Sequence, residues 1–99
     1  MYGVPQFLEI PVTAKPATLV AIADIVTVAA GDANTKLEFL MTSGKIIRFT
    51  TAADAAVANV TDCNTGITNA LAWDVAKKGA KAKEAVTLTQ AASAVAVIY

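Results

Sequence analysis

The feature that most constrains this fold is an alternating apolar segment that ends at a Ser43-Gly44 dipeptide. Residues 36–42 alternate between two faces of a strand, and a second β-branched segment, residues 45–50, follows the dipeptide at once. Side chains of a strand point alternately to its two sides, and a glycine between two such segments favours a tight turn. The pattern therefore predicts an antiparallel hairpin with one buried face, which carries Leu37, Phe39 and Met41.

A long β-branched run, residues 18–30, precedes this hairpin and is interrupted by Asp24. Its composition suits a bent strand better than a helix. Residues 31–34, Gly-Asp-Ala-Asn, have turn composition and are expected to connect it to residues 36–42. We therefore expect three consecutive antiparallel strands.

The prolines all lie near the start of the chain, at positions 5, 11 and 16. Proline cannot donate a hydrogen bond to a neighbouring strand, so it is confined mostly to sheet edges and bulges. Residues 7–13 still have strand composition, and we expect them to form an edge strand or an extended arm.

One helix is expected after the hairpin. Thr51 to Asp54 resembles a helix cap, and apolar residues then recur at spacings of three and four. The expected buried stripe comprises Ala56, Val60, Cys63, Ile67, Ala70 and Leu71, whereas Asn59, Asp62 and Asn69 fall outside it. Gly66 and several threonines lower the helix propensity, so the helix should pack across the open mouth or flank of the sheet.

Residues 85–89 and 94–99 are expected to be strand segments after a polar stretch, residues 74–84. A final strand beside the first would close the sheet and remove an edge. The sequence thus predicts a mainly β, strongly bent antiparallel barrel, with the helix after the fourth strand, in a single domain over residues 1–99.

Enzymatic chemistry is disfavoured because the chain has no histidine and only one cysteine, Cys63. Asp54 and Asp62 lie eight residues apart and form no evident acid/base pair. Cys63 is interpreted as a buried structural thiol, and Trp73 as a core or interface anchor in preference to a base-stacking platform. We therefore expect no enzyme, no cofactor and no metal.

One basic segment stands out in a chain whose formal net charge is zero. This segment, residues 77–83, contains four of the eight cations, whereas residues 1–76 contain seven acids and four cations. Its lysines could bind phosphates of RNA or single-stranded DNA, or could simply keep a solvated loop soluble. The candidate nucleic-acid-binding residues are Lys77, Lys78, Lys81 and Lys83, with Lys45 and Arg48 as possible extensions; Arg48 could instead pair with a carboxylate.

Membrane association is not expected, because the charge-free stretch from residue 85 to 99 is too short to span a bilayer. No secretory signal is recognisable, so cytosolic residence is the default. Alanine supplies 22 of the 99 residues and buries little surface per residue. A monomer would be marginally stable, so we expect self-association.

The chain resembles Sm-like proteins encoded by marine cyanophages. The resemblance rests on residues 7–13, residues 22–28, the Ser43-Gly44-Lys45 hairpin, residues 68–71 and residues 86–99. It implies an Sm-like or SH3-like barrel, assembly into a homo-oligomeric ring, nucleic-acid binding, and residence in the cytoplasm of the infected bacterial host or in the virion. The sequence departs from the Sm pattern, because Asp32-Ala33-Asn34 lacks the loop aromatic and Gly44-Lys45 is not Arg-Gly.

Two hypotheses follow. The first is a ring-forming, Sm-like protein that binds RNA or single-stranded DNA through lysine contacts to phosphate and serves nucleic-acid processing. The second is a phage virion or assembly component that acts through protein contacts, which the apolar, low-charge composition also fits.

Overall fold

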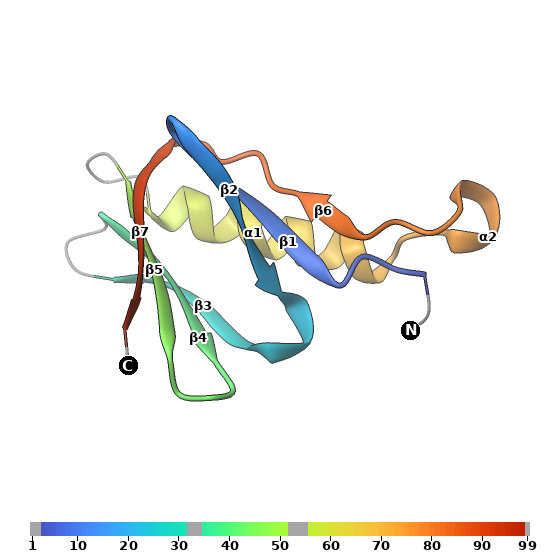
Figure 1. The fold of residues 1–99 in the computed structure, drawn as a ribbon, viewed down its shortest axis with the longest axis horizontal. Coiled ribbons are helices and arrows are strands. Elements are labelled where there is room, and N and C mark those ends of the chain that lie inside the picture. The colour runs from blue at the N-terminus through green and yellow to red at the C-terminus, as the bar shows by residue number, and fades with distance from the viewer. Residues whose placement is uncertain (1–2, 32–34, 52–55, 99) are drawn as a thin grey trace.

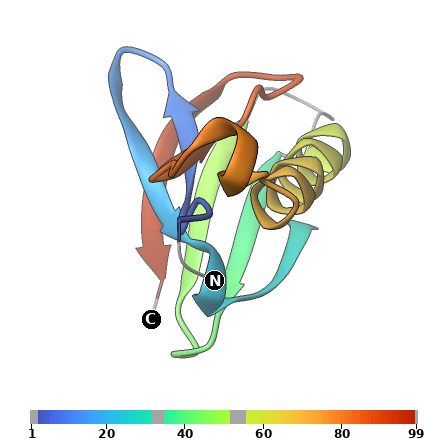
Figure 2. The same ribbon diagram turned by 90° about the vertical axis from the view of Figure 1, so that its right-hand side faces the viewer.

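The computed structural model describes residues 3–31, 35–51 and 56–98. Within them, seven strands form one sheet and one long helix packs against it (Figures 1 and 2). The strands are β1 (Phe7–Val12), β2 (Lys15–Ala21), β3 (Ile25–Gly31), β4 (Lys36–Met41), β5 (Ile46–Thr51), β6 (Lys83–Ala85) and β7 (Ala92–Ile98). The helices are the 3-10 turn η1 (Ile22–Asp24), the long α1 (Ala56–Leu71) and the short α2 (Val75–Lys78).

The predicted three-stranded antiparallel unit is present as β3, β4 and β5. Val28 pairs with Phe39, and Phe39 pairs with Ile47, so these side chains share the inner face of the sheet. Gly44 has a positive φ of 87° in the turn between β4 and β5, which explains the glycine there. The predicted turn at residues 32–34 lies outside the described residues.

The prediction of a single bent strand at residues 18–30 is wrong. The chain forms β2, turns through η1 at Asp24, and continues as β3. Propensity identified the β-branched run correctly but could not show that its two halves join different ends of the sheet. As a result α1 follows the fifth strand of the chain.

The sheet is not closed into a barrel. Its order is β2-β1-β7-β5-β4-β3, with β6 paired to β1, and the end strands β2 and β3 do not pair with each other. The final strand returns to the sheet as predicted, but it pairs along its length with β5 and meets β1 only where Ala92 pairs with Val12. Helix α1 packs against β3, β6, β4 and β1 (Figure 2).

The first strand is an interior strand, not the predicted edge or arm. β1 pairs with β2 on one side and with β6 and β7 on the other. The register shifts between Ile10 and Val12, so Pro11 sits in an irregularity that tolerates its missing N–H. Pro16 lies instead on β2, at the end of the sheet.

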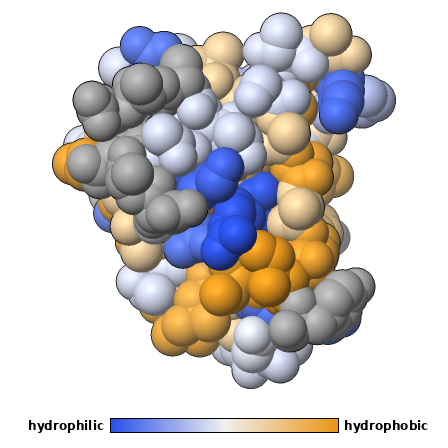
Figure 3. All heavy atoms as spheres, turned by 90° about the vertical axis from the view of Figure 1, so that its left-hand side faces the viewer, coloured by the Kyte–Doolittle hydropathy of each residue, from blue (hydrophilic) through white to orange (hydrophobic). Residues whose placement is uncertain are grey.

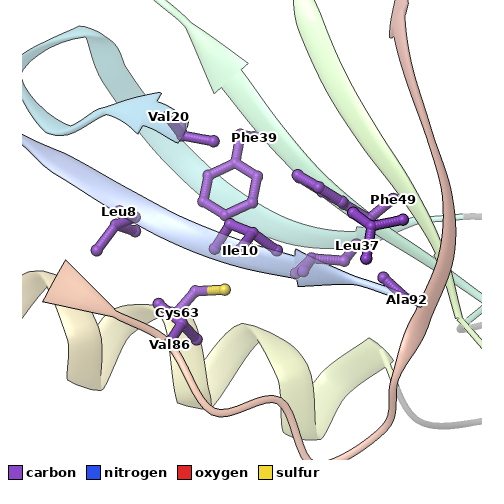
Figure 4. Close-up of a cluster of buried hydrophobic side chains, with 10 residues drawn as sticks. Leu8, Ile10, Val20, Leu37, Phe39, Phe49, Cys63, Val86 and Ala92 are labelled. Atoms are coloured by element: carbon purple, nitrogen blue, oxygen red, sulfur yellow. The ribbon is translucent and has the colours of Figure 1, made fainter. Parts of the chain in front are cut away.

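The core lies between the inner face of the sheet and α1 (Figure 4). Phe39 and Phe49 are fully buried and meet edge to face, with ring centroids 5.7 Å apart. Gly66 brings α1 close to the strands, because a Cβ there would lie 2.9 Å from Cγ2 of Val86. The buried apolar residues of the cluster are Leu8, Ile10, Val12, Val20, Leu37, Phe39, Phe49, Cys63, Val86 and Ala92.

The predicted buried stripe of α1 is correct for Cys63 and Ala70, which are buried. It wrongly includes Leu71 and wrongly leaves out Asn59. Leu71 is 62% exposed, whereas Asn59 is fully buried. The Asn59 side chain donates to the backbone oxygen of Gln90 and accepts from its backbone N–H, each at 3.0 Å. Helical periodicity could not reveal these partners because they lie 31 residues away in the sequence. The predicted cap is mostly outside the described residues, and Thr51 itself is buried at the end of β5.

Candidate functional site

The basic segment folds into a projection at one end of the molecule, which we call the Trp73 projection and define as residues 73–84 (Figure 1). It contains α2 and the first residues of β6, where the sequence suggested only a loop. The Asp74 carboxylate accepts a hydrogen bond from the backbone N–H of Lys77 at 3.1 Å and caps α2. Gly79 ends this helix with a φ of 79°, which favours glycine.

Trp73 organises the projection. Its indole Nε1–H donates to the backbone oxygen of Gly79 at 2.8 Å. The ammonium groups of Lys81 and Lys78 lie 4.3 Å and 5.0 Å from the ring centroid, which is cation–π geometry. The only tryptophan of the chain therefore lies among its lysines.

Carboxylates neutralise part of this basic segment. The Lys81 ammonium lies 3.2 Å from Oε1 of Glu84, and the Lys83 ammonium lies 2.5 Å from Oε2 of Glu9. Lys77 and Lys78 form no ion pair with any residue that the structure describes. Lys77 and Lys78 are therefore the lysines of the projection best placed to meet an anionic ligand, and Lys81 can join them by exchanging its Glu84 partner for the ligand.

A hollow of about 340 Å³ opens beside the indole ring. A second hollow, of about 330 Å³, continues from it along α1 and β6, and the two share Asn69 and Glu84. The first is lined by Asn69, Ala72, Trp73, Asp74, Lys78, Lys81 and Glu84. This lining combines one aromatic wall, two cations and two carboxylates.

The structure does not bring Lys45 and Arg48 to this site. Arg48 pairs with Glu38 on the adjacent strand, with Nε 2.6 Å from Oε2, on the outer face of the sheet. Lys45 lies in the turn between β4 and β5. This turn lies away from α2 (Figure 1). The alternative in which Arg48 pairs with a carboxylate is the one observed.

Trp73 and Asn69 are the site residues that sequence reasoning missed. The sequence shows no aromatic residue between the lysines and favours Trp73 as a core or interface anchor. It is only partly buried, and its contacts with Lys78 and Lys81 depend on how the chain turns at Gly79. The useful signal was the proximity of the lone tryptophan to the lysines, four residues before Lys77.

Other chemistry has little support among the described residues. Burial raises the pKa of the Cys63 thiol to about 12, and the adjacent Asp62 carboxylate adds to the increase. A thiol with such a pKa is a weak nucleophile at neutral pH. No cluster of three or more potential metal ligands occurs in the described ranges. Neither α1 nor α2, the two α-helices described, has the length and hydropathy that a membrane span requires.

Comparison with protein-family models, with curated proteins and with solved structures finds no match to this chain.

Proposed function

We propose that this protein binds RNA or single-stranded DNA through the Trp73 projection, as a binding protein without a catalytic step. The observation that carries the proposal is the position of the Lys78 and Lys81 ammonium groups within 5.0 Å and 4.3 Å of the Trp73 ring centroid. Single-strand-binding proteins combine cations for the phosphates with an aromatic surface for the bases.

The chemistry of the hollow favours a nucleotide over a bare anion. A base can stack on the indole ring when the Lys78 and Lys81 ammonium groups move from the ring to the neighbouring phosphates. Asn69 adds an amide that donates and accepts hydrogen bonds at a base edge. Asp74 and Glu84 limit the excess of positive charge, so we expect weak, salt-sensitive binding.

Self-association belongs to the same proposal, since any assembly of several copies would repeat the Trp73 projection in every subunit; the Sm-like ring that the resemblance implies is one such assembly, and a two-fold dimer is another. Several weak sites on one assembly would bind one strand far more tightly than a single site does. The Sm-like relationship, the origin in a cyanophage and the location in the infected host remain proposals from the residues.

Fluorescence anisotropy with labelled oligouridine and oligothymidine tests the binding. We expect log K to fall with log salt at a slope of about −2, since three lysine contacts to a single strand contribute roughly −0.7 each. The triple variant Lys77→Ala, Lys78→Ala, Lys81→Ala should lose binding, whereas its matched control, Lys15→Ala, Lys36→Ala, Lys45→Ala, should keep it. Equal affinity of the two triple variants, or no binding by the wild type at low salt, would overturn the proposal.

A second candidate function is a structural role in a phage particle or its assembly. It is favoured by the exposed apolar side chains of the sheet, which include Leu19, Leu40 and Val97. Co-purification with intact particles would support this role. Recovery only from lysate, with nucleic acid attached, would instead support the binding function.

A further inference from the structure

Three strand edges longer than three residues have no strand beside them in the described part of the chain; β6, which also pairs on one side only, spans just Lys83–Ala85 and is contacted by α1. The three edges are the outer edge of β2, the outer edge of β3, and residues 94–98 of β7 beyond the point where Ala92 meets Val12. An exposed edge presents unpaired backbone N–H and C=O groups and can pair with another strand. Natural proteins usually protect such edges.

Two of these edges are protected. β2 begins with Lys15 and Pro16, a charge and a missing donor, both of which discourage pairing. β3 is flanked by α1, and Asn64 and Ile67 of this helix line a shared hollow with residues 25–28 of the strand. A strand approaching β3 would have to compete with the helix.

The β7 edge lacks such protection. The strand reads Ala-Ser-Ala-Val-Ala-Val-Ile, without charge or proline, and Val97 is 47% exposed. Both faces of the strand are apolar near its end, because Val97 pairs with Ile47 on the inner face, whereas Ile98 pairs with Ile46, and Ile46 with Leu40, on the outer face. Figure 3, drawn from the side on which β7 lies, shows a broad apolar area there.

We propose that residues 94–98 of β7 pair antiparallel with the same residues of a second copy of this chain around a two-fold axis. A two-fold interface uses the same edge twice, so one unprotected edge is sufficient. A ring built by strand pairing needs two different edges that meet, and the other two edges are obstructed. The dimer would continue one sheet across both copies and bury both Val97 side chains. It goes beyond nucleic-acid binding and does not depend on it.

Light-scattering mass measurement tests the interface with two matched variants. Val97→Lys places a charge on the β7 edge, and Leu19→Lys makes the same change at a similarly exposed aliphatic residue of β2, which is 50% exposed. We expect the wild type and Leu19→Lys to have about twice the chain mass of 10.2 kDa. Val97→Lys should have the single-chain mass with an unchanged circular dichroism spectrum.

Cysteine cross-linking gives a second readout that does not depend on the folding of Val97→Lys. Ala96 lies at the centre of the free segment, and opposite residues of an antiparallel pair have Cα atoms about 4.5–5.5 Å apart, within disulfide range. Ala96→Cys should form a covalent dimer in oxidised glutathione, whereas Ala17→Cys on β2 should not. The buried Cys63 is expected not to interfere.

Three results would overturn the proposal. The first is a wild-type protein that has the mass of one chain at every concentration up to its solubility limit. The second is a wild-type protein with the mass of a larger ring that Val97→Lys does not change. The third is cross-linking of Ala17→Cys without cross-linking of Ala96→Cys. Each outcome is independent of oligonucleotide binding, so the failure of one proposal can be distinguished from the failure of the other.

Discussion

The core and the Trp73 projection are held together by different forces. Buried side chains from β1, β4, β5 and α1 stabilise the core, including fully buried Phe39 and Phe49. None of residues 73–84 is buried, and the projection is held by hydrogen bonds, ion pairs and the cation–π contacts of Trp73. Its backbone is joined to residues 3–6, where Lys81 donates to Gly3 and Gln6 donates to Ala82.

Because of this difference, the residues that determine the stability of the fold are not those expected to bind a ligand. Exposed ion pairs and surface hydrogen bonds contribute little to the free energy of unfolding, whereas a buried aromatic side chain contributes several kcal/mol. Substitutions in the core should therefore unfold the protein, and substitutions in the projection should change ligand binding in a folded protein.

The largest effect is expected for Phe49→Ala. Truncation removes the edge-to-face contact with Phe39 and leaves a cavity in the core, which should lower the free energy of unfolding by about 3–5 kcal/mol. Urea denaturation measures the change. Phe7→Ala, at a residue that is 39% exposed on the neighbouring sheet surface, is the control and should cost much less. Similar losses for both variants would show that the aromatic pair is not central to the core.

Asn59→Ala tests the polar contact between α1 and the segment before β7. It leaves the backbone N–H and C=O of Gln90 without their partners and should cost about 2–3 kcal/mol. Asn64→Ala, at an exposed position on the same helix, should leave the stability almost unchanged. Equal denaturation midpoints of the two variants would show that the contacts of Asn59 with Gln90 do not stabilise the fold.

Cys63 should make the free energy of unfolding fall as the pH becomes alkaline. Its pKa is raised from 9.0 to about 12 in the folded protein, so the folded state retains the proton more strongly than the unfolded chain. The resulting stabilisation is complete below pH 9 and is lost as the pH rises from about 9 towards 12, by about 1.4 kcal/mol per pH unit. Denaturation of wild type and Cys63→Ala between pH 8 and pH 10.5 measures it. Parallel pH profiles of the two proteins would contradict it.

Trp73→Leu should have the smallest effect on stability, below about 1 kcal/mol, because the ring is only partly buried and its hydrogen bond is exposed. Its effect on oligonucleotide affinity should be larger, about tenfold, since stacking contributes roughly 1–3 kcal/mol per base. Trp73→Phe retains an aromatic face and should restore part of the affinity. A large loss of stability would instead make Trp73 a structural anchor.

Sequence reasoning predicted local features more successfully than long-range ones. Alternation correctly identified β4, β5 and the buried residues Leu37 and Phe39. It could not show that the β-branched run divides at Asp24, or that β7 pairs with β5 and leaves the barrel open. Strand pairing and the partners of Asn59 depend on contacts between residues far apart in the chain, which periodicity does not encode.

For the candidate site too, the sequence predicted local features but not contacts between residues far apart in the chain. Composition located the lysines correctly as a local basic segment, but the charges near Lys81 and Lys83 depend on Glu84 and Glu9. Trp73 joins the site because Gly79 turns the chain back towards the ring. Linear spacing could suggest such a turn but could not show which residues it brings together.

The most direct test is nuclear magnetic resonance of the ¹⁵N-labelled protein during titration with oligouridine. Trp73 is the only tryptophan, so its indole N–H gives a single assignable signal. We expect this signal and the amides of residues 69–84 to shift together, while the amides of β4 and β5 remain in place. Shifts concentrated around Arg48 and Lys45, with an unchanged indole signal, would contradict this expectation.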